Sequence, residues 1–126
     1  MSKKIIHTTA APGAIGPYSQ AIQTGNLLFV SGQIPINPAT NELVMDNIQD
    51  ETKQVMENLK AVLSAANVGF ENIVKTTIFL SDMGLFAAIN EVYGSYFTGD
   101  YPARETVAVK GLPKGVNVEI SAIAFI

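Results

Sequence analysis

The sequence predicts an α+β domain whose elements follow the order ββαβαββ. Several short segments alternate apolar with polar residues, which is the period of a strand with one buried face. Two longer segments repeat apolar residues at helical spacing. The 126 residues suffice for one hydrophobic core and are too few for a second. Residues 1–126 are therefore interpreted as a single domain with both helices on one face of a sheet.

The first two strands are predicted to form a hairpin. Residues 10–17 contain two prolines and two glycines and are interpreted as a loop. One strand is expected over 18–23 and the next over 27–31, because the Gly-Asn dipeptide between them is typical of a tight turn. A second loop, with two prolines, covers 35–41.

The first helix is predicted to begin at a capping box. Asp46 is followed three residues later by Gln49, a pattern typical of a helix start. The helix is expected to end near residues 67–69, where Asn and Gly suit a helix terminus. Its expected buried face contains Ile48, Thr52, Val55, Met56, Leu59, Val62, Leu63 and Ala66.

The second half of the chain predicts a strand, a helix and two more strands. Residues 74–80 alternate between an apolar and a mixed face. Ser81 or Asp82 is expected to cap the next helix, and strands follow over 104–110 and 116–125. The connection Gly-Leu-Pro-Lys-Gly between these strands suits a hairpin loop. The predicted helix has Phe86, Ile89, Tyr93 and Phe97 along one side.

The last strand indicates what covers each face of the sheet. Its even-numbered residues from 116 to 126 are all apolar, so this face is expected beneath the helices. The opposite face combines Glu119 with Ile123 and Phe125, next to Phe79 of the neighbouring strand. Because no helix is left to cover this apolar surface, a second copy of the same chain is the expected cover.

Composition excludes several classes of function. The chain has no cysteine, which excludes disulfides, thiol catalysis and cysteine metal sites, and its one histidine, His7, is interpreted as an ordinary strand residue. A net charge of −3 without a basic run argues against nucleic acid binding. No apolar run approaches the length of a membrane span, so a soluble cytoplasmic protein is expected.

Arg104 and Glu119 are the candidate catalytic residues. Pro102 fixes the backbone before Arg104, and a guanidinium held in a defined direction grips a small carboxylate with two hydrogen bonds. An arginine at a strand start is also typical of a solvated surface charge. Packing of a second copy over Glu119 is expected to raise its pKa towards a useful acid/base range, while a carboxylate at the rim of the sheet is the alternative.

Other residues add little chemistry on their own. Tyr18 and Ser31 lie on the predicted hairpin strands and offer neutral hydrogen bonds. The glycines of the first third of the chain do not form a phosphate-binding pattern before a helix. Neither a metal nor another cofactor is therefore expected. Six ordered blocks do stand out, and they are Ala11–Gln20, Val30–Pro35, Asn90–Tyr93, Pro102–Arg104, Leu112–Gly115 and Val118–Ile120.

Together these blocks closely resemble the RidA/YjgF family of imine/enamine deaminases, over almost the whole chain. The resemblance implies a chorismate-mutase-like fold, one mixed sheet with two helices on one face, assembled as a homotrimer with sites between subunits. It implies hydrolysis of reactive 2-imino acids, such as 2-iminobutanoate and 2-iminopropanoate, to 2-oxo acids and ammonia without a cofactor.

The resemblance also assigns roles to residues. Arg104 would bind the substrate carboxylate, and Glu119 would position or activate the attacking water. The pocket would be lined by Tyr18, Ser31, Gly32 and Asn90, and the main-chain carbonyl of Thr106 would accept the imine N–H.

Two positions depart from the family pattern. Thr106 stands where many relatives have cysteine, and Ser121 replaces a second glutamate, which leaves Glu119 as the only carboxylate of its strand. Two other functions stay open: a regulatory module that binds 2-oxo acids, and an RNA-directed translation inhibitor or endoribonuclease. Arg104 speaks against the first, and the acidic charge balance speaks against the second.

Overall fold

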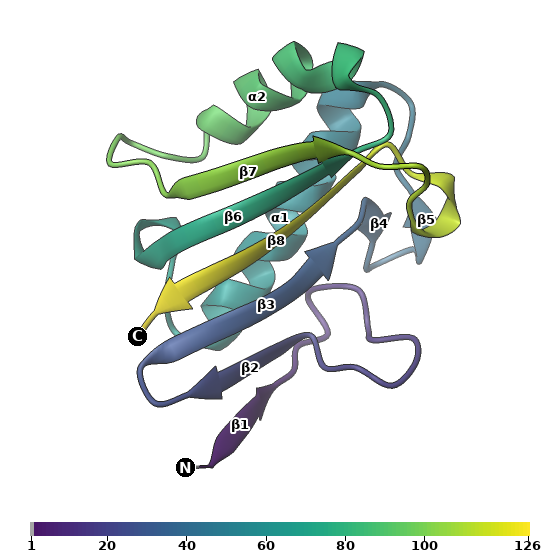
Figure 1. Ribbon diagram of the computed structural model, residues 1–126. Coiled ribbons are helices and arrows are strands. Elements are labelled where there is room, and N and C mark those ends of the chain that lie inside the picture. Colours follow the sequence, from purple (N-terminus) through teal and green to yellow (C-terminus); the bar gives the residue numbers. More distant parts are fainter. Residues whose placement is uncertain (1) are drawn as a thin grey trace.

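A computed structural model describes residues 2–126 as a sheet covered on one face by two helices (Figure 1). The helices are α1 (Ile48–Ala65) and α2 (Phe86–Gly94). Two short strands, β4 (Ile36–Asn37) and β5 (Glu42–Leu43), form a separate pair. The main sheet has the strand order β1 (Lys3–Ile6), β2 (Ala21–Thr24), β3 (Leu27–Gln33), β8 (Val118–Phe125), β6 (Ile73–Leu80) and β7 (Ala103–Ala108).

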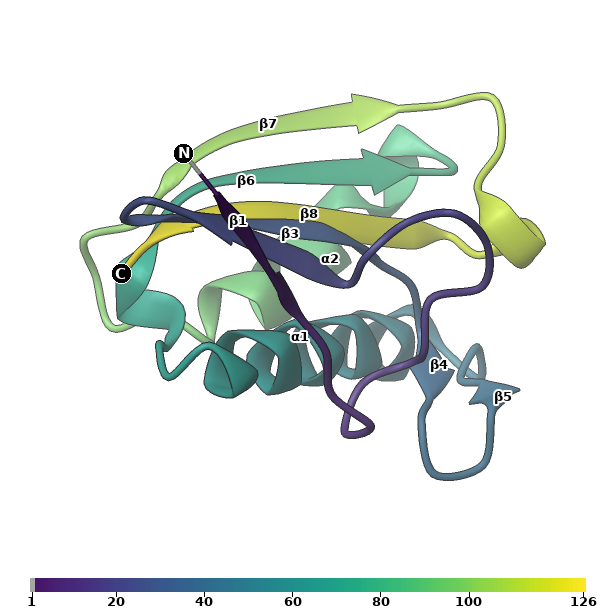
Figure 2. The same cartoon turned by 90° about the horizontal axis from the view of Figure 1, so that it is seen from below.

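The sheet is mixed, and its two helices share one side. β6 and β7 run parallel, while every other neighbouring pair in the main sheet is antiparallel. Figure 2 shows α1 and α2 on the same side of the sheet, with the other side open. The predicted fold class is therefore confirmed. No helix in residues 2–126 has the length and apolar character to cross a bilayer.

Helix α1 supplies much of the core. Asn47 is its N-cap, with Oδ1 accepting from the backbone N–H of Asp50 at 2.8 Å. The predicted cap at Asp46 was thus one residue early. The helix ends at Ala65 because Asn67 adopts a left-handed φ of 61°. Its fully buried apolar residues are Val55, Met56, Leu59, Val62 and Leu63.

The faces of β8 follow the predicted alternation. Val118, Ile120 and Ala124 are completely buried beneath the helices. On the other face Phe125 is exposed, and Ile123 is half-buried. The neighbouring strand β3 continues this open apolar surface. Its exposed large side chains are Leu27 and Phe29.

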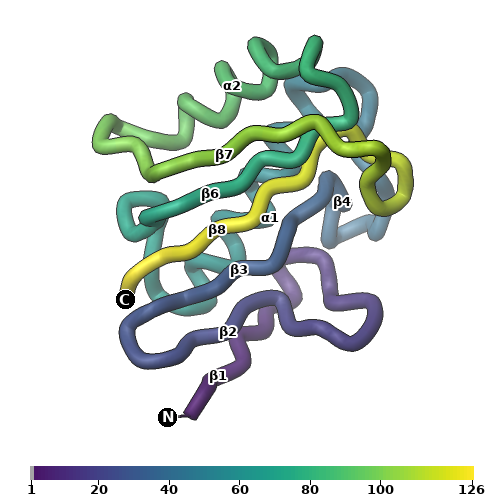
Figure 3. Tube along the Cα trace, viewed as in Figure 1, coloured from purple at the N-terminus to yellow at the C-terminus, as the bar shows by residue number. Residues whose placement is uncertain are grey.

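The predicted hairpin of the last two strands is wrong. β6 lies between β7 and β8, and Figure 3 shows the chain leaving β7, looping round and returning as β8 on the far side of β6. The cause is the crossover through α2, which returns the chain parallel to β6 and fills the edge position beside it. The connection around Pro113 contains a short 3₁₀ helix rather than a hairpin turn.

Several element boundaries also differ from the prediction. The N-terminal strand β1 and the pair β4–β5 were missed, and His7 follows β1 outside any strand. Tyr18 lies in the loop before β2 rather than on a strand. Asp82 caps a 3₁₀ turn that leads into α2, with Oδ1 accepting from Gly84 N–H at 2.8 Å.

Candidate functional site

All predicted site residues except Thr106 line one of two cavities, which lie on opposite faces of the sheet. The Glu119 cavity, of about 520 Å³, is lined by the loop before β2, the end of β3, the turn at 113–114 and Glu119. The Arg104 cavity, also of about 520 Å³, lies between the end of α2 and the start of β7. It is lined by Asn90, Tyr93, Gly94, Tyr101, Pro102 and Arg104.

Strand register places the two charges on different faces. Arg104 is the register partner of Thr76, which is buried on the helix side. Glu119 is the register partner of Phe79, whose strand neighbours Ile78 and Leu80 face the helices. Neighbouring residues in register project to the same side of a sheet, so Arg104 points to the helix side and Glu119 to the open side.

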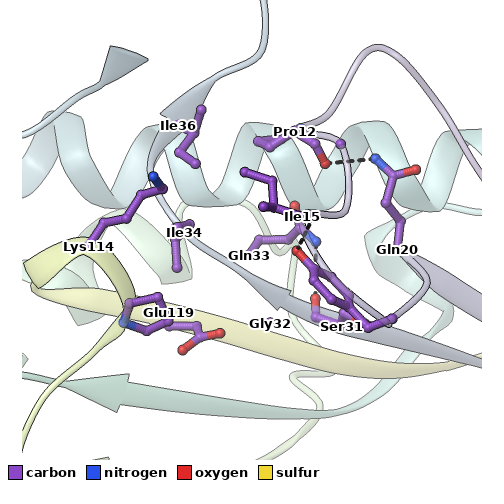
Figure 4. Close-up of a pocket in the computed structure, with 13 residues that line it drawn as sticks. Pro12, Ile15, Gln20, Ser31, Gly32, Gln33, Ile34, Ile36, Lys114 and Glu119 are labelled. Carbon is purple, nitrogen blue, oxygen red and sulfur yellow. Dashed lines mark hydrogen bonds between the residues drawn. The ribbon is translucent and has the colours of Figure 1, made fainter. Parts of the chain in front are cut away.

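Glu119 sits beside a bulge in β3. The register between β3 and β8 shifts between Val30 and Gln33, which leaves Ser31 and Gly32 in the irregular stretch. A side chain at position 32 would meet the Glu119 carboxylate, since an added Cβ would lie 2.8 Å from Glu119 Cδ. Figure 4 shows Gly32 next to this carboxylate. Glycine therefore permits the close approach of backbone and carboxylate.

Partial burial sets the protonation behaviour of Glu119. Desolvation raises the pKa of its carboxyl group above the ordinary glutamate value. Lys75 and Glu105 form the one ion pair found in residues 2–126. No Lys or Arg of these residues therefore lies within ion-pair distance of Glu119. A carboxylate without a cationic partner is suited to exchanging a proton with water.

A buried glutamine fixes the wall of the Glu119 cavity. Gln20 is only 3% exposed, and its Nε2 donates to the Pro12 carbonyl at 2.8 Å, as Figure 4 shows. Its Oε1 accepts from Thr8 N–H at 2.8 Å. Ser31 Oγ donates to the Ser19 carbonyl at 2.6 Å. These bonds hold the loop before β2 against the end of β3.

Arg104 is the only arginine of the chain, and helix α2 orients it. Its Nη1 donates to Asn90 Oδ1 at 2.6 Å. Its guanidinium carbon lies 5.4 Å from the Phe86 ring centre and 5.2 Å from the Tyr93 ring centre. These are cation–π distances. The guanidinium is thus held by one amide and two rings at the mouth of a cavity.

Thr106 lies two residues beyond Arg104 on the same face of the edge strand β7. Its Oγ1 is buried without a hydrogen-bond partner in residues 2–126. Thus Asn90, Arg104 and Thr106 gather on the helix side. The remaining predicted site residues, which are Tyr18, Ser31, Gly32 and Glu119, line the other cavity.

Sequence reasoning missed the roles of four residues that line the two cavities or contact Arg104. Phe86 and Tyr93 were assigned only to the buried side of the helix. Asn90 lies four residues after Phe86 and three before Tyr93, so the sequence already placed all three on one helix face. Gln20 belongs to the block 11–20 that resembles the family, but the sequence did not indicate its role in holding the cavity wall. Lys114 lines the Glu119 cavity and itself adopts a left-handed backbone conformation with φ 57°. No sequence pattern indicates this placement. No group of three or more potential metal ligands occurs in residues 2–126.

Comparisons with known proteins cover nearly the whole chain. A family model described as Endoribonuclease L-PSP matches residues 8–126. Protein DfrA of Myxococcus xanthus is 56% identical, with 98% of this chain and 96% of the relative covered. The 2-iminobutanoate/2-iminopropanoate deaminase of Mus musculus is 48% identical, with 97% and 90% covered.

Solved structures agree with this similarity. A Rid-family protein, YyfA of Yersinia pestis, superposes with a TM-score of 0.97 at 49% identity, covering 99% of this chain and 100% of that one. E. coli TdcF with bound serine superposes with a TM-score of 0.94 at 46% identity, covering 98% of each chain. The chain therefore belongs to the RidA/YjgF family, whose family model carries the description Endoribonuclease L-PSP.

Proposed function

We propose that this protein hydrolyses reactive 2-imino acids, such as 2-iminobutanoate and 2-iminopropanoate, to 2-oxo acids and ammonia. The observation that carries the proposal is the oriented guanidinium of Arg104 at an open cavity. One of its five N–H donors is used by Asn90, and within residues 2–126 no carboxylate lies at ion-pair distance. The remaining donors are suited to a bidentate contact with a substrate carboxylate.

The site would form between copies of the chain. Arg104 and Glu119 lie on opposite faces of one sheet, so a single chain does not offer both groups to one small substrate. A head-to-tail assembly brings one face of a subunit against the other face of the next, and a closed ring repeats this contact at every interface. The exposed apolar residues of the open face, such as Phe29 and Phe125, support such packing. We propose a homotrimer with one site at each interface.

In this scheme Glu119 would handle water. Its carboxylate would take a proton from water as the water oxygen adds to the C=N carbon, and would pass that proton to nitrogen to give a carbinolamine. It would then take the hydroxyl proton of the carbinolamine and pass it to nitrogen as the C–N bond breaks and ammonia leaves. One water is consumed, the C=N bond becomes C=O, and no oxidation occurs. The main-chain carbonyl of Thr106 would accept the imine N–H, while Tyr18, Ser31 and Gly32 would line the Glu119 side of the site.

Names among relatives support part of this proposal. Mouse and human relatives named as 2-iminobutanoate/2-iminopropanoate deaminases are 48% and 43% identical to this chain. TdcF was solved with serine, which carries the same α-carboxylate that Arg104 would bind. More similar relatives carry the names DfrA or RutC family protein. A direct assay of imine hydrolysis tests whether this chain shares the deaminase activity.

The assay generates 2-iminobutanoate in place with threonine dehydratase and traps it with semicarbazide. We expect the added protein to lower the rate of trapping and to raise the rate of 2-oxobutanoate release. An unchanged trapping rate at protein concentrations equal to the dehydratase would contradict the deaminase function. Incubation with single-stranded RNA provides the second arm, because cleavage that Glu119→Gln abolishes would favour the endoribonuclease alternative.

A further inference from the structure

Three residues of α2 surround the guanidinium of Arg104 from one side. Phe86, Asn90 and Tyr93 follow a spacing of four and three residues, so they share one face of the helix. Asn90 accepts a hydrogen bond from Arg104, and the two rings lie within cation–π distance of it. Of the two rings, Tyr93 is the one that is itself fixed by a polar contact.

Tyr93 is anchored deep in the core by Thr76. The two hydroxyl groups lie 2.7 Å apart, Tyr93 is 3% exposed and Thr76 is 1% exposed. Burial raises the pKa of Tyr93, although the Thr76 hydrogen bond and the charge of Arg104 oppose the rise. The phenol therefore stays protonated near neutral pH and remains able to donate to Thr76.

The residue that anchors Tyr93 also lies directly beside Arg104 in the sheet. Thr76 is the register partner of Arg104 in the parallel pair β6–β7. Backbone pairing fixes the start of the arginine side chain, and the Thr76–Tyr93–guanidinium contacts fix its end. Such a closed set of contacts limits the rotamers of a long flexible side chain before any ligand binds.

We propose that Tyr93, held by Thr76, is a positioning residue that presents the free N–H edge of Arg104 to a carboxylate. This inference rests on the proposed function, because it assumes that Arg104 binds the carboxylate of a 2-imino or 2-oxo acid. Tyr93 acts through the guanidinium and stabilises carboxylate binding without touching the reacting carbon.

The test measures 2-oxobutanoate binding by calorimetry in the assembled protein. Tyr93→Phe keeps the ring but removes its anchor, and we expect binding about threefold to tenfold weaker. Tyr96→Phe is the matched control, since Tyr96 lies on the same segment with its hydroxyl bonded to Glu57 at 2.6 Å and contacts Phe70 rather than Arg104. This control is expected to bind like the parent.

Two further variants separate positioning from stability. The pair Thr76→Val with Tyr93→Phe removes both hydroxyl groups, so no buried polar group is left unsatisfied and the thermal midpoint should return towards the parent. Its binding should stay as weak as that of Tyr93→Phe. In an Arg104→Lys background, Tyr93→Phe should change binding by less than about twofold, because the planar group that the ring orients is absent.

Each outcome bears on a different part of the inference. Parent-like binding by Tyr93→Phe overturns the positioning role and leaves the proposed function standing. The positioning role is also overturned if the paired variant binds 2-oxobutanoate as well as the parent, because weak binding would then track the loss of stability. An equal loss of binding in the Arg104→Lys background overturns it too, because the effect of Tyr93 would not depend on the guanidinium. Absence of 2-oxobutanoate binding by the parent overturns this inference, because the carboxylate contact that it assumes is then missing, while the trapping assay tests the proposed function separately.

Discussion

Arg104 is the residue on which the proposed function depends most directly. We predict that Arg104→Lys stays folded but loses activity on the order of a hundredfold in kcat/KM, since an ammonium does not reproduce the planar two-point contact. Lys110→Arg is the control, because it also exchanges one exposed basic side chain for the other near the same strand and keeps the charge. Equal activity of parent and Arg104→Lys in the trapping assay would make Arg104 a surface charge.

Glu119 gives a prediction about stability and pH. Burial raises its pKa in the folded chain, so between the unfolded and the raised folded pKa the folded state holds more protons. The free energy of unfolding contributed by this group is therefore greatest at low pH and falls as pH rises through that window. Urea unfolding of Glu119→Gln is expected to lack this fall, and an identical pH dependence in parent and variant would contradict the burial of the carboxylate.

At the scale of elements, the bulge where β3 meets β8 controls the placement of Glu119. We predict that Gly32→Ala lowers kcat/KM on the order of tenfold to a hundredfold, because the added methyl group displaces the carboxylate. Gly111→Ala is the matched control, since a Cβ there would meet nothing within 4 Å. Steady-state kinetics with thermal unfolding of both variants checks the prediction, and a parent-like Gly32→Ala would show that the carboxylate has room to move without loss.

Elements also show why sequence reasoning succeeded only in part. The alternation in β8 and the apolar spacing in α1 are local periods, so both could be predicted from neighbouring residues. The position of β7 could not, because the loop at 111–115 resembles a hairpin connection while strand pairing is decided by the crossover through α2. β1 was missed because its four residues are mostly exposed and carry no alternation.

The candidate site shows the same division. Arg104 and Glu119 were found from their chemistry and their sequence blocks, but the face that each one occupies depends on register with β6. The roles of Phe86 and Tyr93 around Arg104 appear only when α2 is placed against β7. A contact between a helix and a strand that follows it has no period in the sequence, so three-dimensional packing was needed to reveal it.

At the scale of the whole molecule, the face of the sheet that no helix covers is apolar and is suited to packing against another subunit. Leu27, Phe29, Val107 and Phe125 are each between 38% and 45% exposed, on strands β3, β7 and β8. We predict a homotrimer in native mass spectrometry at micromolar concentration, because a ring covers this face on every subunit. Phe29→Glu is expected to weaken the assembly, whereas a stable parent monomer would contradict a site built between subunits.

The central claim is that Arg104 of one subunit and Glu119 of another act on the same substrate, and mixing two inactive variants tests it. Arg104→Lys and Glu119→Gln subunits are co-refolded in equal amounts and assayed for imine hydrolysis by semicarbazide trapping. In a random mixture about one quarter of interfaces would pair an intact Arg104 with an intact Glu119, so we predict recovery of roughly a quarter of the parental activity. Native mass spectrometry confirms that mixed oligomers have formed. Mixed oligomers as inactive as either variant alone would show that the two residues do not meet across an interface.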